Sequence, residues 1–228
     1  MKTLIIIPAY NEAQNIERVV DNLIGGYPQY DYLVVNDGSS DNTAEICKKR
    51  GYRFVSHPVN LGLAGAFRTG MMYARRHDYD CAIQFDGDGQ HDPAYIEAMI
   101  MEIEAGADIV IGSRFVTEKK PLTARMIGNN LIEGCIILTT GKKIKDPTSG
   151  MRMFNKKMIK ELADAVDLGP EPDTMALLYR KGANIKEIQV KINERIAGKS
   201  YLTAAKSLNY MLRMINSILF LQWFRKGD

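Results

Sequence analysis

Short apolar runs alternate with stretches of helical periodicity along most of this 228-residue chain. Between the runs, apolar residues recur every three or four positions, as at Ile16, Val19, Val20 and Leu23. This alternation is typical of βαβ units and a mostly parallel sheet, so it predicts the α/β fold class. We expect strands at residues 4–7, 32–35, 54–55, 81–85 and 109–111, with helices at about 13–24, 42–50 and 63–76 between them.

The last third of the chain continues with strands expected at 151–154 and 185–192 and helices at 156–165 and 173–181. An amphipathic helix at about 202–224 closes it. We therefore expect one domain over residues 1–200, with residues 201–228 as an appended C-terminal amphipathic helix. The longest apolar stretch, 208–224, falls short of the ~18 apolar residues of a membrane span. It is interrupted by Asn209, Arg213, Asn216 and Gln222.

Positive charge is concentrated at the C-terminal end. Residues 180–228 contain ten Lys or Arg and three acidic residues, a net charge of +7, whereas the whole chain carries +3. The overall charge is too small to indicate nucleic-acid binding. The basic segment fits either a solvated helix face or a surface for an anionic partner.

Three scattered cysteines favour neither a disulfide framework nor a thiolate metal site, and the first residues show no signal-peptide pattern. We therefore expect a cytoplasmic location, with association at the cytoplasmic face of the membrane left open.

The run Asp86-Gly87-Asp88-Gly89-Gln90 directly follows an expected buried strand. In open α/β sheets, ligands bind at the carboxyl ends of strands. Two carboxylates spaced by a glycine can converge on one hard cation, and Mg²⁺ or Mn²⁺ prefers such oxygen ligands. The alternative is a turn rich in Asp and Gly.

Three further polar segments should lie at the same edge of the sheet: residues 8–12 (PAYNE), 36–41 (NDGSSD) and 60–62 (NLG). Tyr10 can stack on a base, and Glu12 and Asp37 can accept hydrogen bonds from a base or ribose. Together these segments predict a nucleoside pocket beside a metal that holds a diphosphate. Neither a dinucleotide fingerprint nor a P-loop follows the first strand.

These motifs, with residues 86–93 (DGDGQHDP), occur in the order and at the spacings of glycosyltransferase family 2, which the chain resembles over most of its length. Residues 112–114 (GSR) and 146–152 (DPTSGMR) are similar to the branch that contains dolichol-phosphate mannose synthase and bacterial polyprenyl-phosphate glycosyltransferases. The resemblance implies a GT-A fold, a UDP- or GDP-sugar donor, an essential divalent metal and inversion at the anomeric carbon.

The resemblance also implies roles for individual residues. The metal would be held by Asp86, Asp88 and Gln90, and the acceptor phosphate by Arg114 and Arg125. The nucleotide sugar would be contacted by Pro8, Ala9, Tyr10, Glu12, Asp37, Asp86, Gly87, Asp88 and Arg195. One departure is visible, because mannose synthases often carry Gly-x-Ser-Lys after this arginine, whereas residues 198–201 here are GKSY. Lys199 is our candidate for the same phosphate contact.

The acceptor decides whether a catalytic base is needed. A sugar hydroxyl must lose its proton to a carboxylate, whereas a polyprenyl phosphate is already an anion near neutral pH. If a base acts, Glu171 and Asp173 are the candidates. We favour Glu171, so Asp88 and Glu171 are the expected catalytic residues. The alternative is that Glu171 and Asp173 only cap a helix and complete its first turn.

Three functions remain open. The first is transfer to undecaprenyl or dolichyl phosphate, the second is transfer to a sugar hydroxyl in cell-wall or capsular polysaccharide assembly, and the third is a catalytically silent nucleotide-binding scaffold. The C-terminal helix could lie on an anionic bilayer, pack on the domain or join a second copy of the chain.

Overall fold

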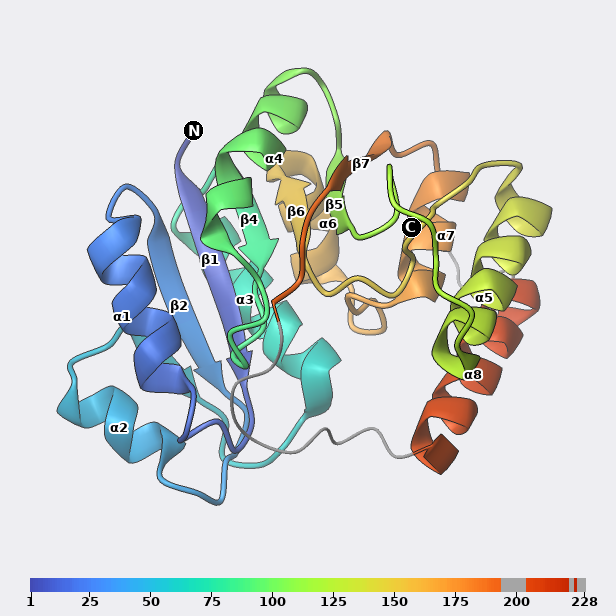
Figure 1. Cartoon of the computed structure of the whole chain (residues 1–228). Helices are drawn as coiled ribbons and strands as arrows, with labels where there is room; N and C mark the ends of the chain where they lie inside the picture. The colour runs from blue at the N-terminus through green and yellow to red at the C-terminus, as the bar shows by residue number, and fades with distance from the viewer. Residues whose placement is uncertain (194–203, 222–223, 225–228) are drawn as a thin grey trace.

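The computed structural model describes residues 1–193, 204–221 and 224, with the backbone alone for 124, 125 and 204–208 (Figure 1). Its centre is a seven-stranded sheet in the order β3-β2-β1-β4-β6-β5-β7. All neighbours pair in parallel except β6, which runs antiparallel to β4 and β5. The strands are β1 (Thr3–Ala9), β2 (Asp31–Asn36), β3 (Phe54–Ser56), β4 (Cys81–Gln84), β5 (Ile109–Ser113), β6 (Arg152–Asn155) and β7 (Ile185–Gln189).

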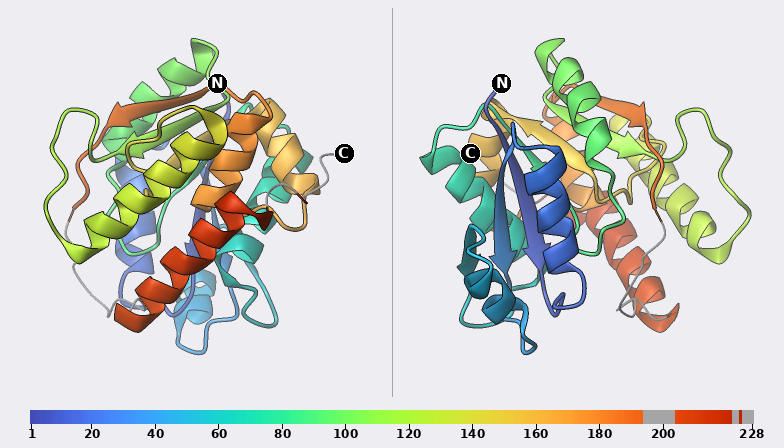
Figure 2. Two further views of the ribbon diagram at one scale, coloured as in Figure 1. Left: turned by 90° about the vertical axis from the view of Figure 1, so that its right-hand side faces the viewer. Right: turned by 60° about the vertical axis from the view of Figure 1, so that its left-hand side comes forward.

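Helices cover both faces of the sheet, so its central strands are apolar at consecutive positions (Figures 1 and 2). On β1, Ile5 and Ile7 pack with α1 and α4, whereas Leu4 and Ile6 pack with α3 and α6. The helices are α1 (Ile16–Gly26), α2 (Thr43–Lys49), α3 (Gly62–Arg76), the 3₁₀ turn η1 (Pro93–Tyr95), α4 (Ile96–Glu104), α5 (Ala124–Thr140), α6 (Lys156–Asp164), α7 (Pro172–Arg180) and α8 (Ala204–Leu219).

The structure bears out the α/β class and the mostly parallel sheet, and it adds one helix that the periodicity did not predict. Thr123 caps α5 by accepting a hydrogen bond from the backbone N–H of Met126, and Gly141 ends the helix in the left-handed region. The strand expected at 185–192 is shorter, ending at Gln189. Its partner β5 ends at Ser113, and only one further bond, from Val190 N to the Ser113 carbonyl, follows.

Helix α8 lies beside α5 and packs on the domain (Figure 2). Met214 and Ile218 are buried in the core between α8 and the rest of the chain. Gly128 of α5 allows this close approach, because a Cβ there would lie 1.6 Å from Sδ of Met211. Packing on the domain therefore accounts for the inner face of the amphipathic helix.

Among the helices of the described residues, none combines the length and apolar character that crossing a bilayer requires.

Candidate active site

The loops after β1 and β2 are joined to each other at the carboxyl edge of the sheet, the lower edge in Figure 1. Asn11 has a φ of 56°, and its Oδ1 accepts hydrogen bonds from the backbone N–H groups of Ser40 (2.9 Å) and Asp41 (3.3 Å). Its own N–H donates to Oγ of Ser39 (3.0 Å). Asn tolerates the left-handed region better than most residues, so this position suits it. The two segments form one surface.

Asp37 is buried and held from two sides. Its Oδ1 accepts the Leu61 N–H at 2.8 Å and lies 2.8 Å from Nδ1 of His57. Nε2 of His57 lies 2.8 Å from Oγ1 of Thr69 on α3. Neither His57 nor Thr69 was predicted from the sequence to belong to the site. The signal for His57 was its position directly after β3, at the same edge of the sheet.

Tyr10 and Glu12 of the loop after β1 have different surroundings. Tyr10 is 37% exposed. Glu12 lies just before α1, where its Oε2 accepts a hydrogen bond from Nδ2 of Asn15 (2.8 Å). Gly87 brings the acidic cluster against this loop, because a Cβ on it would lie 3.2 Å from the Pro8 carbonyl oxygen and 3.6 Å from Cγ of Glu12. The predicted nucleoside loop and the acidic cluster are therefore adjacent.

The two carboxylates of the cluster are oriented by short-range hydrogen bonds. Oδ1 of Asp86 accepts from Nε2 of Gln84 at 3.2 Å, and Oδ1 of Asp88 accepts from the Gln90 N–H at 3.0 Å. The Asp86 N–H donates to Nδ1 of His91 at 3.0 Å, so Nδ1 carries no proton. Nε2 of the same ring lies 3.5 Å from Oδ2 of Asp86. No role for His91 was predicted from the sequence.

Gly150 leaves space in front of Asp86. A Cβ at this position would lie 2.6 Å from Oδ2 of Asp86, so only glycine permits the observed approach of the two loops. The Asp88 side chain is almost fully buried, whereas 38% of the Asp86 side chain is exposed. Across the described residues, no cluster of three or more His, Cys, Asp or Glu is arranged for a metal ion.

Arg114 directly follows β5 and forms a bidentate ion pair. Its Nε and Nη2 each lie 2.7 Å from an oxygen of Asp146, and Nη2 also donates to Oγ1 of Thr148 at 3.2 Å. Asp146 is fully buried. Burial alone would raise the pKa of its carboxyl, but the hydrogen bonds and charge of Arg114 hold the pKa below its usual value. The guanidinium thus has a structural partner already. The side chain of Arg125 lies outside the described residues.

Both candidate bases contact α8. Oε1 of Glu171, at the N-cap position of α7, accepts a hydrogen bond from Nη2 of Arg213 at 2.8 Å. Asp173 is buried, and its Oδ2 accepts from Oγ of Ser217 at 2.6 Å. Burial, followed by the charge of Glu171, raises the pKa of the nearby Tyr210 to about 12, so this phenol stays neutral. The C-terminal helix therefore contributes to the candidate acceptor side.

Comparison with known proteins matches residues 4–163 to the family model for glycosyl transferase family 2. The chain belongs to this family. It is 27% identical over 226 residues to the polyprenol monophosphomannose synthase of Mycolicibacterium smegmatis, covering 93% of this chain and 85% of the relative. It is 33% identical over 213 residues to a UDP-N-acetylglucosamine–dolichyl-phosphate N-acetylglucosaminyltransferase of Methanococcus voltae, covering 82% and 84%.

A third relative, the dolichol-phosphate mannosyltransferase of Pyrococcus furiosus, is 31% identical over 226 residues, covering 92% of this chain and 62% of the relative. Among solved structures, the fold is similar to glucosyl-3-phosphoglycerate synthase from Mycobacterium tuberculosis in complex with Mn²⁺, UDP and phosphoglyceric acid. The TM-score is 0.68 at 19% identity, over 96% of this chain and 78% of the other. The chain is thus a glycosyltransferase with a GT-A fold.

Gln90 connects the acidic cluster of this glycosyltransferase to Asn193. Its Nε2 donates to the Asn193 carbonyl at 3.2 Å, and the Asn193 N–H donates to the Gln90 carbonyl at 2.9 Å. With Nε2 engaged, Oε1 is the amide atom suited to a cation. Arg195 and Lys199, which the resemblance assigned to the donor and the acceptor phosphate, lie outside the described residues.

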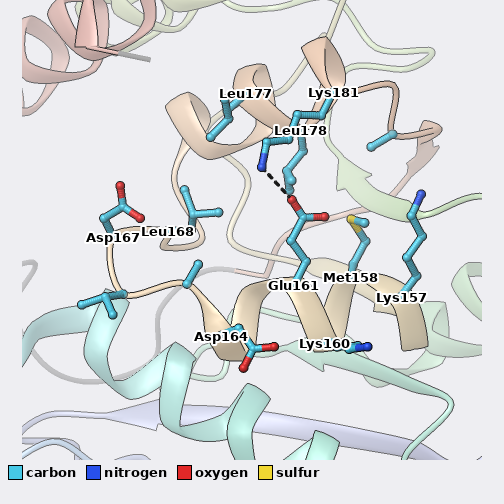
Figure 3. Close-up of a pocket in the computed structure, with 13 residues that line it drawn as sticks. Lys157, Met158, Lys160, Glu161, Asp164, Asp167, Leu168, Leu177, Leu178 and Lys181 are labelled. Atoms are coloured by element: carbon cyan, nitrogen blue, oxygen red, sulfur yellow. Dashed lines mark hydrogen bonds and ion pairs between the residues drawn. The ribbon is translucent and has the colours of Figure 1, made fainter. Parts of the chain in front are cut away.

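Two hollows are present in the described structure of the glycosyltransferase. A cavity of about 1000 Å³ lies between α6 and α7, where Figure 3 shows Glu161 and Lys181 joined across it. A smaller one, about 360 Å³, lies behind the acidic cluster and is lined in part by Arg18, Gly89 and His91. We take the carboxyl edge of the sheet as the candidate active site, because the side chains predicted to bind the nucleotide sugar come together there.

The Arg114–Asp146 ion pair leads to a first prediction, which concerns the stability of the glycosyltransferase fold. Arg114→Ala should destabilise the fold by about 3 kcal/mol at neutral pH, because it leaves a buried carboxylate without its partner. A carboxyl with a depressed pKa stabilises the fold above its unfolded pKa, and this stabilisation is lost as pH falls through the folded pKa. The difference in the free energy of unfolding between wild type and Arg114→Ala should therefore become smaller toward acid pH. Urea unfolding at several pH values measures it, and equal stabilities at pH 7 would contradict the structural role.

Proposed function

We propose that this glycosyltransferase transfers a sugar, with inversion and with a divalent metal, from a nucleotide-sugar donor to a polyprenyl phosphate. The observation that carries the proposal is the junction at Gly87, where the backbone of the acidic cluster lies against Pro8 and Glu12 of the first loop. A site of this kind can hold a metal-bound diphosphate and its nucleoside side by side. The named activities of the relatives support a polyprenyl-phosphate acceptor.

The acidic cluster fits Mg²⁺ or Mn²⁺. Asp86 and Asp88 supply two hard oxygen ligands, the Oε1 atom of Gln90 supplies a third, and Gly150 leaves room beside Asp86. Such cations keep several positions for water and substrate phosphates. When bound, the metal would stabilise the negative charge on the departing nucleoside diphosphate.

The nucleoside of the donor is proposed to bind at the loop beside the acidic cluster. Tyr10 is partly exposed and is the proposed stacking partner of the base, and the hydrogen bonds from His57 and Leu61 fix the Asp37 carboxylate. A fixed acceptor of this kind selects N–H or O–H donors of a base or ribose at low entropic cost. In this proposal Ala9 and Glu12 complete the contact surface, and Arg195 adds a charge to the donor.

The acceptor is proposed to be a phosphate because the carboxylates near it are already engaged. Arg213 holds Glu171, and Ser217 holds Asp173 in a buried position. An anionic phosphate oxygen can attack the anomeric carbon without giving up a proton, so neither carboxylate has to act as a base. Arg125 and Lys199 are the proposed phosphate contacts, and Asp146 fixes the guanidinium of Arg114 through a bidentate ion pair.

Glu171→Gln tests this choice of acceptor. With a polyprenyl phosphate, we expect the variant to keep most of its turnover, because no proton transfer is lost. Transfer to a sugar hydroxyl would instead lose about 100-fold or more when its general base is removed. Steady-state rates with both acceptors measure the difference, and Glu161→Gln is the matched control, since Glu161 also pairs with a basic residue but lies away from the site.

A polyprenyl acceptor resides in a bilayer, and we propose that α5 and α8 dock there. Their outer faces expose several large apolar side chains, whereas Met214 and Ile218 on the inner face of α8 are buried. Contiguous exposed apolar surface marks interaction sites, and neighbouring basic residues favour an anionic membrane. These exposed residues, which we call the α5–α8 face, are Ile127, Leu131 and Leu138 on α5, Leu212 on α8, and Phe220 and Leu221 directly after α8.

Anionic liposomes test the α5–α8 face. The double variant Leu131→Gln, Leu212→Gln should bind liposomes of phosphatidylglycerol less tightly than wild type in a flotation assay, with unchanged thermal stability. Val166→Gln is the control, because Val166 is even more exposed (82%, against 55% for Leu131 and 56% for Leu212) but lies on the loop after α6. Equal flotation of all three proteins would refute the membrane role. A change in oligomeric state instead would identify the face as a contact between copies.

A further inference from the structure

Arg152 is the largest fully buried side chain among the described residues, and none of the functions above uses it. It begins β6, opposite Gln84 on β4 and Ile111 on β5. Its strand neighbours Met151 and Met153 pack on the α1–α4 face, so its guanidinium lies on the side of α3 and α6. A buried charge is costly unless the structure uses its hydrogen bonds.

The guanidinium joins two loops. Its Nη1 donates to the Pro170 carbonyl, and its Nη2 donates to the Pro147 carbonyl at 2.6 Å. Both acceptors are neutral, and no carboxylate of the described residues forms an ion pair with Arg152. Pro170 directly precedes Glu171, the candidate acceptor-side carboxylate. Pro147 belongs to the segment 146–150.

That segment contacts both halves of the site. At one end Asp146 holds Arg114, and at the other Gly150 lies against the Asp86 carboxylate. Asp86 is tied in turn to Gln84, the cross-strand neighbour of Arg152. Gln84 Oε1 and Arg152 Nε, an acceptor and a donor, are both buried without a hydrogen-bond partner in the described structure. One buried side chain therefore connects the metal-binding strand with both acceptor-side loops.

We propose that Arg152 is a positioning residue that fixes the acceptor-side loops, at Pro147 and Pro170, relative to the Asp86–Asp88 metal site. The proposal rests on the proposed function for its kinetic consequence only. Arg152 touches neither donor nor acceptor in this account. It sets the distance between the carboxylates that hold the donor diphosphate and the loops that receive the acceptor.

Arg152→Lys tests the proposal, because lysine keeps the charge but cannot reach two diverging carbonyls with a planar fork. We expect the folded variant to bind the nucleoside diphosphate with Mn²⁺ as tightly as wild type in calorimetry. Its kcat should fall about 100-fold, the order expected for a misplacement of about 1 Å. Arg53→Lys, at a surface ion pair with Asp31 directly before β3, is the matched control and should leave both values unchanged.

Amide hydrogen exchange gives a readout that does not need an acceptor. In Arg152→Lys, the non-proline amides of 146–150 and 169–175 should exchange about tenfold faster, while those of β1 and β2 stay protected. Unchanged exchange in the two loops, or unchanged kcat, would overturn the proposal. So would a loss of nucleotide affinity equal to the loss of kcat, since that indicates general damage.

Arg152→Gln is the second variant if the lysine variant does not fold, and failure of both would assign Arg152 to stability alone and reject the positioning role. If wild type transfers no sugar to any polyprenyl phosphate, the proposed function fails, and the exchange experiment still decides the role of Arg152.

Discussion

Replacing Asp88 by Asn is expected to lower the rate of sugar transfer about 1000-fold, because metal stabilisation of a departing charge is worth several kcal/mol. The substitution keeps the volume of a nearly buried side chain and removes only its charge. Asp88 also accepts the Gln90 N–H, which the amide oxygen of Asn can still do. The fold should therefore survive while metal-dependent turnover is lost.

Release of nucleoside diphosphate with saturating Mn²⁺ measures this effect. Asp164→Asn is the control, because Asp164 forms only an exposed pair with Arg75. A variant that retains more than about one tenth of wild-type turnover would show that Asp88 is not a metal ligand, because metal stabilisation is worth much more than that. A variant whose thermal unfolding shifts strongly would point to a structural role instead.

Gly150→Ala is expected to weaken Mn²⁺ binding about 10- to 100-fold, the size of effect seen when groups that orient a metal ligand are disturbed. The added methyl would lie 2.6 Å from Oδ2 of Asp86, so the carboxylate or the loop must move. Titration of Mn²⁺, followed by electron paramagnetic resonance, measures the change directly.

Gly134→Ala provides the comparison for this substitution. Gly134 lies in α5 with nothing within 4 Å of the added methyl, so metal affinity should not change. Wild-type Mn²⁺ affinity in Gly150→Ala would mean that Asp86 does not ligate the metal in the observed position.

The strands and most helices could be predicted because their apolar spacing is a local property. Residues such as Ile16, Val19 and Leu23 repeat at helical spacing and are buried as expected. Helix α5 was missed because its apolar residues are distributed around it, with Ile127, Leu131 and Leu138 exposed. The antiparallel direction of β6 was also not predictable, since pairing depends on the connection rather than on the strand's own residues.

The carboxyl edge was predictable for a similar reason. Parallel strands bring their following loops together, so Tyr10, Asp37 and Asp86 had to lie near one another. Partnerships between distant residues could not be predicted from spacing. The sequence suggested Arg114 as a phosphate ligand and Glu171 as a base, but it could not reveal that Asp146 and Arg213 hold them. The role of α8 at the acceptor side depends on tertiary packing alone.

The central claim is that the chain transfers sugar to a polyprenyl phosphate. The direct measurement incubates the wild-type protein with radiolabelled UDP- or GDP-sugars, Mn²⁺ and undecaprenyl or dolichyl phosphate, and then extracts the lipid. We predict metal-dependent label in the organic phase with one of these donors, and its loss on chelation. Label that stays in the aqueous phase with every donor, while a sugar acceptor becomes labelled, would contradict the account.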